Sequence, residues 1–339
     1  MILITGATGL IGGHLTATLV LQGKKIRALY RNKAKQEKVK EILSFYTSDT
    51  EKYFSQIEWV QGDVTDVFTI EDALSGVEEV YHCAGLVSFD EADRIQLQKI
   101  NAEGTANVVN MSLEKNVKKF CHVSSVATLQ VQANKKYIDE FSVWKTASGT
   151  SSYAISKYRG EFEAWRGMSE GLNVVVVNPS LVLGAGCWGQ SSGELITRTK
   201  KGVPFYTEGI TGYVDVRDVA NCMIKLMDEN KFGSRYILNS ENLSFYKVTT
   251  ELRKLFGKKP SKFKAESFLL NVARYADWAR VLLGGKRRVI TKNIVLSALD
   301  KNFYDNSKIG KELNYSFIPV NESLAYVAEK YVKSRMAFA

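Results

Sequence analysis

The sequence is poor in the residues that build disulfide frameworks, metal sites and linkers. Among its 339 residues are only four cysteines, three histidines and four prolines. The cysteines lie far apart and form no CxxC pair, so the sequence predicts neither a disulfide framework nor a metal site, and we expect reduced, buried thiols. The scarcity of proline argues against a Pro-rich linker between two halves of the chain.

Long hydrophobic runs are also missing. No apolar stretch approaches the ~18 residues that a membrane span requires. The first ten residues, MILITGATGL, contain neither the basic n-region nor the cleavage site of a secretory signal. We therefore expect a cytoplasmic protein without an integral membrane segment.

Charge is the one marked excess. The chain has 46 Lys and Arg against 36 Asp and Glu, a formal charge of +10, in an otherwise ordinary globular composition. A basic surplus suits nucleic acid, an anionic membrane surface or a phosphate-bearing ligand. Because no motif that reads nucleic acid occurs, we expect a small-molecule substrate and no nucleic-acid partner.

The C-terminal third contains two basic runs, GKKPSKFK and GGKRR. They fit either a solvated face or a site for an anionic substrate group. The stretch 268–283 has an apolar face, with Arg274 and Arg280 beside it. A solvated or core-packed helix is the expected structure there, and contact with a membrane or an acidic substrate tail is the alternative.

Short β-rich runs alternate with helical periodicities through the first half of the chain. The runs of strand length are 2–5, 25–30, 57–61, 79–83, 120–124 and 173–178, and the helical stretches include 11–21, 33–43, 94–113 and 152–166. This alternation predicts an α/β fold with a doubly wound parallel sheet of Rossmann type. We place a dinucleotide-binding domain at 1–180, with a further core strand from about 213–240. A smaller, mixed and mostly helical substrate unit follows at 181–339.

The strongest local motif is ILITGATGLIGGHL. Gly6 permits a tight turn after the first strand, Gly9 lets the backbone approach a pyrophosphate, and Gly12 allows the following helix to pack on the strand. The N-terminus of that helix adds a partial positive charge. The motif predicts a dinucleotide site, and a flexible turn is the alternative. The predicted cofactor contacts in this loop also include Thr8, Leu10 and Ile11.

The end of the second strand predicts which dinucleotide binds. An NAD site usually carries a carboxylate there, whereas this chain has Arg31 followed by Lys33 and Lys35. Such a cluster suits a 2′-phosphate, with Arg31 as a bidentate partner and Lys35 as a point charge. NADP(H) is therefore the preferred cofactor and NAD(H) the alternative, unless the run is only a solvated helix start. Asp63 could accept from the adenine amino group or cap a turn.

Tyr153 and Lys157 lie four residues apart, on one face of a predicted helix. The spacing recurs at Tyr304 with Lys308 and at Tyr326 with Lys330, so the context has to decide. Tyr153 follows a Ser-rich helix start between the fifth and sixth strands, which places it at the cleft. A neighbouring cation makes its phenol a usable acid and base. Ser125 is the favoured holder of a substrate oxygen, and Ser124 is its rival or a support for the cofactor.

Eight motifs in the order TGATGLIG, GDVTD, VYHCAG, INAEGTANVV, HVSSVA, SYAISK, VVNPSLVLGAG and GYVDVRDVA resemble the extended short-chain dehydrogenase/reductase family, in particular its NAD(P)-dependent epimerase/dehydratase group. The resemblance implies a catalytic triad of Ser125, Tyr153 and Lys157. It further implies cofactor contacts at Asp63, Val64, Ala84, Gly85, Ser124, Tyr153, Lys157, Asn178, Pro179 and Ser180. A role for Asn101 in supporting the central helix and a homodimer through the helix of Tyr153 are also implied.

Where the sequence differs from that group, it indicates a narrower class of reaction. Asn178-Pro179 and the IRALYR run look more like the branch with dihydroflavonol reductase, cinnamoyl-CoA reductase and 3-beta-hydroxysteroid dehydrogenase. We expect an NADP(H)-dependent oxidoreductase that reduces a carbonyl, or oxidises a secondary alcohol, of a small and fairly apolar substrate. A nucleotide-sugar epimerase with tightly bound NAD and a non-catalytic NADP-sensing protein are the alternatives. Candidate substrate residues, which could instead join the two units, are Ser88, Phe89, Trp188 and Tyr213.

Overall fold

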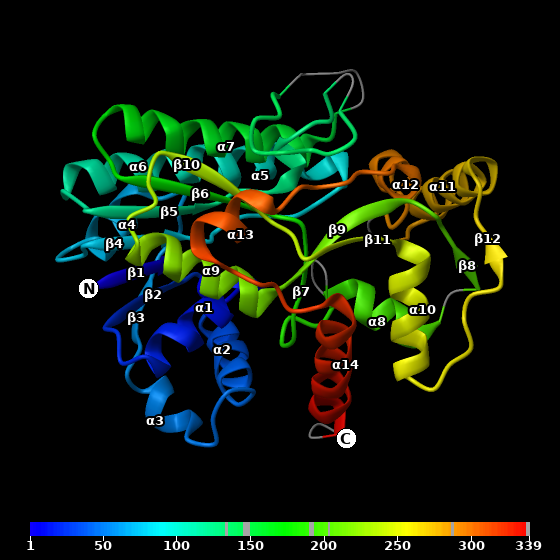
Figure 1. Cartoon of the computed structure of the whole chain (residues 1–339), viewed down its shortest axis with the longest axis horizontal. Coiled ribbons are helices and arrows are strands. Elements are labelled where there is room, and N and C mark those ends of the chain that lie inside the picture. Colours follow the sequence, from blue (N-terminus) through cyan, green and yellow to red (C-terminus); the bar gives the residue numbers. More distant parts are fainter. Residues whose placement is uncertain (133–134, 145–149, 190–192, 203, 286–287, 337–339) are drawn as a thin grey trace.

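A computed structural model describes residues 1–132, 135–144, 150–189, 193–202, 204–285 and 288–336. Its centre is a seven-stranded parallel sheet with the strand order β10-β6-β5-β4-β1-β2-β3 (Figure 1). The strands are β1 (Ile2–Thr5), β2 (Ile26–Tyr30), β3 (Glu58–Gln61), β4 (Glu79–His82), β5 (Lys119–Val123), β6 (Val174–Pro179) and β10 (Ser234–Leu238). The predicted Rossmann-type fold class is confirmed.

The central strands are buried on both faces because alternate side chains enter two separate cores. In β1, Ile2 and Ile4 belong to one core and Leu3 to the other. The four consecutive valines of β6 divide in the same way, and all are fully buried. Continuous runs of β-branched residues therefore mark parallel strands in this sequence.

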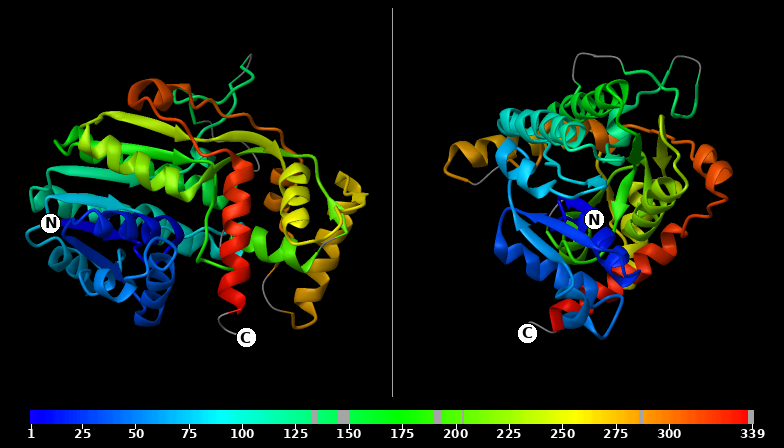
Figure 2. Two further views of the ribbon diagram at one scale, coloured as in Figure 1. Left: turned by 60° about the horizontal axis from the view of Figure 1, so that its bottom comes forward. Right: turned by 90° about the vertical axis from the view of Figure 1, so that its left-hand side faces the viewer.

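Helices cover both faces of the sheet (Figure 2). The first core lies under α1 (Leu10–Leu21), α2 (Gln36–Leu43), α3 (Thr50–Phe54) and α9 (Val216–Asp228). The second lies under α4 (Val67–Ala73), α6 (Gly104–Glu114) and α7 (Ser152–Ser169). This arrangement leaves the carboxyl ends of the strands open along one edge, where ligands bind in open α/β sheets.

The predicted single helix at 94–113 is wrong at its centre. The structure has α5 (Arg94–Gln98), a π-helical segment η3 (Lys99–Glu103) and then α6. Within η3 the Asn101 side chain bonds the backbone of Leu86 and the Ser156 hydroxyl. Insertions of this kind are frequent at functional sites, because they re-aim a side chain without ending the helix. A 3.6-residue periodicity does not reveal them.

After β6 the chain leaves the large sheet, returns to it once through β10, and leaves it again. A three-stranded sheet is formed by β7 (Leu181–Leu183), β9 (Ile210–Asp215) and β11 (Glu241–Ser244), and a two-stranded one by β8 (Phe205–Tyr206) and β12 (Phe263–Lys264). The remaining helices are α8 (Gly193–Lys201), α10 (Phe245–Leu255), α11 (Ser267–Leu282), α12 (Lys292–Leu299), α13 (Ser307–Leu313) and α14 (Val320–Met336). Short 3-10 turns are η1 (Lys33–Lys35), η2 (Glu91–Asp93) and η4 (Val126–Thr128).

The four cysteines are free thiols, of which Cys83 is half-buried and the others are buried. Within the described ranges, no helix combines the length and the apolar character needed to cross a bilayer.

Candidate functional site

The turn between β1 and α1 forms a cradle that only glycine fits. Gly6 has φ +65°, and a Cβ there would stand 2.6 Å from the backbone nitrogen of Ala84. A Cβ on Gly12 would stand 2.3 Å from the Gly6 carbonyl oxygen. Gly9 closes the turn by donating its N–H to that same oxygen at 2.9 Å. A side chain at Gly6 would therefore push the turn away from the loop after β4, and one at Gly12 would push α1 away from the end of β1.

The N-terminus of α1 is open to an anion. Gly9 caps the helix without any side-chain hydrogen bond, and the first turn contains no acidic residue. Gly9 is exposed, and Thr8, Leu10 and Ile11 around it are half-buried. Free N–H groups and the helix dipole make this end suitable for a pyrophosphate. The glycine cradle and the open helix end together fit the dinucleotide that the motif predicts.

The predicted adenosine end places Arg31 and Asp63 side by side. The Arg31 guanidinium lies 3.4 Å from Asp63 Oδ2, and its side chain is 63% exposed. Burial raises the pKa of the Asp63 carboxyl, but hydrogen bonds from Thr65 and Arg31 outweigh it and hold the pKa below its usual value. Lys35 is half-buried in η1, and the range from Ile26 to Lys35 contains no carboxylate. Val64 is buried next to Asp63.

The three predicted catalytic residues come together at the carboxyl ends of β5 and β6. Tyr153 lies in the first turn of α7, and the Ser125 side chain is close enough to lower the pKa of its phenol. One turn later, Lys157 is buried and donates from Nζ to the Val123 carbonyl oxygen at 2.7 Å. A Cβ on Gly85 would stand 3.7 Å from that Nζ. The ammonium therefore lies between the end of β5 and the loop after β4.

Burial controls the protonation of this group. It raises the pKa of Tyr153, which the hydrogen bond with Ser125 partly offsets. It lowers the pKa of Lys157 to about 8, although the nearby Glu161 carboxylate acts in the opposite direction. Lys157 is therefore mainly charged at neutral pH and titrates in an accessible range.

The loop after β4 faces Tyr153. The Asn101 side chain holds it at Leu86, and the Phe89 ring meets the Tyr153 ring edge-on with centroids 5.6 Å apart. Ser88 is bonded to the Asp93 carboxylate at 2.7 Å. Ala84 and Gly85 begin the loop, so these predicted residues lie at one edge of the sheet with Tyr153 and Lys157.

Glu161 is a member of this region to which the sequence analysis assigned no role. It lies one turn beyond Lys157, it is 2% exposed, and its carboxylate accepts hydrogen bonds from several segments. The donors are Ser124 Oγ at 2.5 Å, Thr128 Oγ1 at 2.9 Å, Asn178 Nδ2 at 3.0 Å and Trp165 Nε1 at 3.2 Å. The Arg235 guanidinium of β10 lies 3.3 Å away. Its spacing could have identified Glu161 in the sequence, because Tyr153, Lys157 and Glu161 follow one another at four-residue intervals on one helix face.

Asn178, Pro179 and Ser180 end β6 next to this network. Asn178 Nδ2 donates to the Ser125 carbonyl and to Glu161, while its Oδ1 is buried with no partner among the described residues. Buried amide oxygens are normally hydrogen-bonded, so the orphaned acceptor marks a point where a ligand donor would fit. Ser180 Oγ donates to the Leu238 carbonyl at 3.2 Å.

Two of the four candidate substrate residues lie in other environments. Trp188 donates from Nε1 to Glu41 at 3.0 Å and packs edge-on against Tyr331 of α14. Tyr213 is fully buried in β9 and meets the Phe245 ring. The structure thus brings Phe89 to Tyr153, but it packs Trp188 and Tyr213 in the core formed by α8, α10 and α14.

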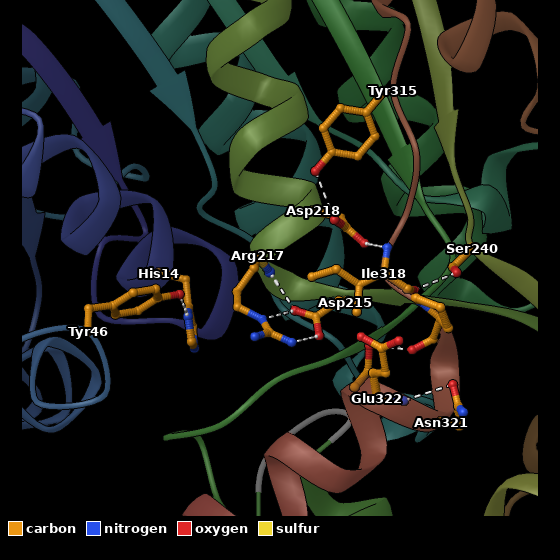
Figure 3. Close-up of polar contacts among 12 residues, drawn as sticks. His14, Tyr46, Asp215, Arg217, Asp218, Ser240, Tyr315, Ile318, Asn321 and Glu322 are labelled. Atoms are coloured by element: carbon orange, nitrogen blue, oxygen red, sulfur yellow. Dashed lines mark hydrogen bonds and ion pairs between the residues drawn. The ribbon is translucent and has the colours of Figure 1, made fainter.

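A second polar cluster joins α9 to the chain before α14 (Figure 3). Asp215 caps α9 and forms a two-point ion pair with Arg217, whose guanidinium lies 4.0 Å from the centroid of the Tyr326 ring. Asp218 accepts from the Tyr315 hydroxyl at 2.8 Å and from the Ile318 N–H at 2.9 Å. The sequence GYVDVRDVA therefore attaches the C-terminal segment to the face of the large sheet.

Asp218 makes stability depend on pH. Burial raises its pKa to about 6 from 3.8, so between these values the folded chain keeps a proton that the unfolded chain loses. This contribution is complete below about pH 4 and is lost as the pH rises through 6.

Asp218→Asn should remove this decline in the free energy of unfolding, which amounts to about 2–3 kcal/mol at 1.36 kcal/mol per pKa unit. Urea unfolding from pH 4.5 to 7.5 measures it, with exposed Asp72→Asn as control; parallel curves for Asp218→Asn and wild type would contradict it.

Comparisons with known proteins agree with this fold. A model of the NAD dependent epimerase/dehydratase family matches residues 2–239. A bifunctional dihydroflavonol 4-reductase/flavanone 4-reductase of Malus domestica is 26% identical over 315 residues, 88% of each chain. The yeast methylglyoxal/isovaleraldehyde reductase Gre2 with NADPH superposes with a TM-score of 0.75 at 19% identity over 98% of each chain. The Bordetella bronchiseptica enzyme WbmH with NAD+ gives 0.73 at 18% over 97% of each.

Proposed function

The chain belongs to the NAD dependent epimerase/dehydratase family, and from this premise we propose that it is an NADP(H)-dependent oxidoreductase. It reduces a carbonyl, or oxidises a secondary alcohol, of a small and fairly apolar substrate. The observation that carries the proposal is the grouping of Ser125, Tyr153 and Lys157 beside the glycine cradle. The reductase name of the Malus domestica relative supports the direction of the chemistry.

The chain's own residues would bind the substrate oxygen and move one proton. When bound, the nicotinamide supplies or accepts a hydride. The Ser125 side chain is close enough to Tyr153 to affect its pKa, so both hydroxyls can reach one carbonyl oxygen, and Tyr153 would donate its proton as that oxygen becomes an alcohol. The Lys157 ammonium, buried one turn further along α7, would stabilise the phenolate that remains, because a nearby cation favours the charged form of a phenol.

The preference for NADP(H) rests on Arg31. Its guanidinium is exposed and only weakly paired with Asp63, so it can turn to a 2′-phosphate. Arg31→Ala should raise the KM for NADPH about tenfold, because a charged hydrogen bond contributes about 1.5–3 kcal/mol and exposure reduces it. The KM for NADH should change by less than about twofold. Steady-state kinetics with both cofactors measure this, with Lys24→Ala as control, and an NADH preference that survives Arg31→Ala would refute it.

A nucleotide-sugar epimerase with tightly bound NAD is the second candidate. The family match and the likeness to the NAD-bound WbmH fold favour it. Mass spectrometry of the denatured protein separates the two candidates, because stoichiometric retained NAD supports the epimerase and its absence supports the reductase. A non-catalytic NADP sensor is disfavoured, since a sensor needs neither the Tyr153 phenol nor the Lys157 ammonium.

The proposal also covers the domain division, the location and the oligomeric state of the protein. The division is into 1–180 and 181–339, and the location is the cytoplasm. The oligomer is a homodimer through α7, on which the Phe162 ring is 59% exposed.

A further inference from the structure

Helix α11 is oriented with its apolar side outward. Its 16 residues, SFLLNVARYADWARVL, are mostly apolar, yet the one buried residue among them is the acidic Asp277. Asp277 accepts hydrogen bonds from the N–H groups of Val289 and Ile290 at 2.7 and 3.0 Å, and from Arg280 at 3.0 Å. Half-buried Leu270 and Val281 share the inner side with Asp277, so the apolar residues of the helix are divided between an inner side and an outer one.

The outward face forms a continuous line, here called the apolar stripe. It follows the spacing i, i+4, i+7, i+11, i+14 and ends just beyond the helix. Its members are Phe268 (81% exposed), Val272 (49%), Tyr275 (61%), Ala279, Leu282 (66%) and Leu283 (89%). Exposed large side chains in such a line are uncommon on a monomeric protein and mark a contact surface.

Most of the excess charge of the sequence lies in the segment that contains this stripe. Residues 258–292 contain ten Lys and Arg against two Asp and Glu, a net +8 out of the whole chain's +10. Eight of these ten cations lie in the described ranges 258–285 and 288–292. Figure 1 shows α11 and α12 at the end of the molecule opposite to the N-terminus, so this end carries a basic excess.

A shallow hollow lies beside the stripe. It has a volume of about 130 Å³ and is lined by Arg274, Tyr275, Trp278 and Arg288. Arg274 Nε is buried without a hydrogen-bond partner in the described part of the chain, and its guanidinium lies 4.5 Å from the Tyr275 ring centroid. Two guanidinium groups and two amphipathic rings suit an anionic group held at the boundary between water and an apolar phase.

We propose that α11 docks on an anionic phospholipid bilayer, with the apolar stripe in the acyl boundary and the surrounding cations at the headgroups. At 1.5 Å per residue the helix is about 24 Å long, which suits an orientation in the plane of the interface. The basic residues supply the charge complementarity, each contributing about fivefold to partitioning onto an anionic leaflet. A second copy is a poorer occupant, because it would bring two basic surfaces together.

Co-sedimentation with vesicles tests the proposal directly and does not require an active enzyme. The protein should pellet with vesicles of phosphatidylcholine containing a quarter phosphatidylglycerol. Binding should fall at least tenfold on pure phosphatidylcholine vesicles and again in 0.5 M NaCl, since screening weakens the contribution of the cations. Equal binding to both vesicle types, or no binding to either, would overturn the proposal.

Matched variants locate the contact. The double variant Phe268→Ser, Leu282→Ser should reduce vesicle binding more than tenfold. Phe68→Ser is the control, because it removes a similarly exposed ring on α4, 74% exposed, and it should leave vesicle binding unchanged. The pair Arg288→Glu and Lys292→Glu should lose binding, and Lys24→Glu with Lys25→Glu should retain it. Circular dichroism confirms that each variant is folded. If the Ser variants instead abolish a dimer seen by sedimentation, the stripe is an interface between copies and the lipid proposal is wrong.

Discussion

Tyr153→Phe is expected to lower the rate of carbonyl reduction about 10³-fold while the affinity for NADPH stays within about twofold. The phenol is the one group that donates the proton in the proposed reaction, and general acid catalysis contributes about 10²–10⁴ in rate. The ring itself remains, so its edge contact with Phe89 is preserved. Single-turnover rates report the chemistry, and fluorescence titration with NADPH reports the binding.

Tyr326→Phe is the matched control. Tyr326 and Lys330 have the same four-residue spacing as Tyr153 and Lys157, but Tyr326 lies on α14 against the Arg217 guanidinium. Phenylalanine keeps that cation–π contact, so activity should be unchanged. Activity retained in Tyr153→Phe would exclude Tyr153 as the proton donor and leave the cofactor site untouched.

Glu161→Gln is expected to destabilise the fold by about 2–3 kcal/mol. The carboxylate is buried and faces only donors, so an amide would turn an N–H group towards at least one of them. The Arg235 guanidinium would lose its anion, and breaking a buried ion pair costs about 3–5 kcal/mol, reduced here because Arg235 is partly exposed. Urea unfolding measures the loss. Glu163→Gln, which breaks the surface pair with Arg166, is the control and should cost less than about 1 kcal/mol.

The same substitution should shift the pH profile of activity. Burial lowers the pKa of Lys157 to about 8, and the Glu161 carboxylate already limits this lowering. Without the carboxylate the ammonium loses its proton at lower pH, so the alkaline fall in kcat/KM should begin earlier in Glu161→Gln than in wild type. A destabilised variant with an unchanged alkaline limb would show that Glu161 only supports the fold.

The sequence was sufficient where structure is specified locally. The valines of β6 and the residues Gly6 and Gly12 fix a buried strand and a turn through their own side-chain volumes, so the sheet and the glycine cradle were predictable. Asn101 shows the limit of prediction from local sequence, because its π-helical segment depends on the distant loop that its side chain holds at Leu86. Glu161 shows the same for a buried charge, since its donors come from three distant segments that no short motif contains.

Helix α11 illustrates the limit in another way. The sequence predicted a helix with an apolar face, solvated or core-packed, and the structure has a largely exposed helix. The sequence did not show which side of the helix faces the protein. Asp277 decides the orientation through its bonds to Val289 and Ile290, a contact across a turn that the periodicity does not show. For Trp188, a position in a Gly-rich loop suggested the cleft, whereas packing against Tyr331 was set by α14, far along the chain.

The return of β10 to the large sheet has a consequence for building chimaeras. The chain visits the outer layers through β7 to β9, comes back as β10 beside β6, and then leaves again through β11. A graft of the substrate unit from a relative therefore needs three junctions, one after residue 180 and one on each side of the segment from α9 to β10. A single splice after residue 180 would put the relative's β10 beside this chain's β6, and a poorly matched pair exposes an apolar strand edge that recruits other chains.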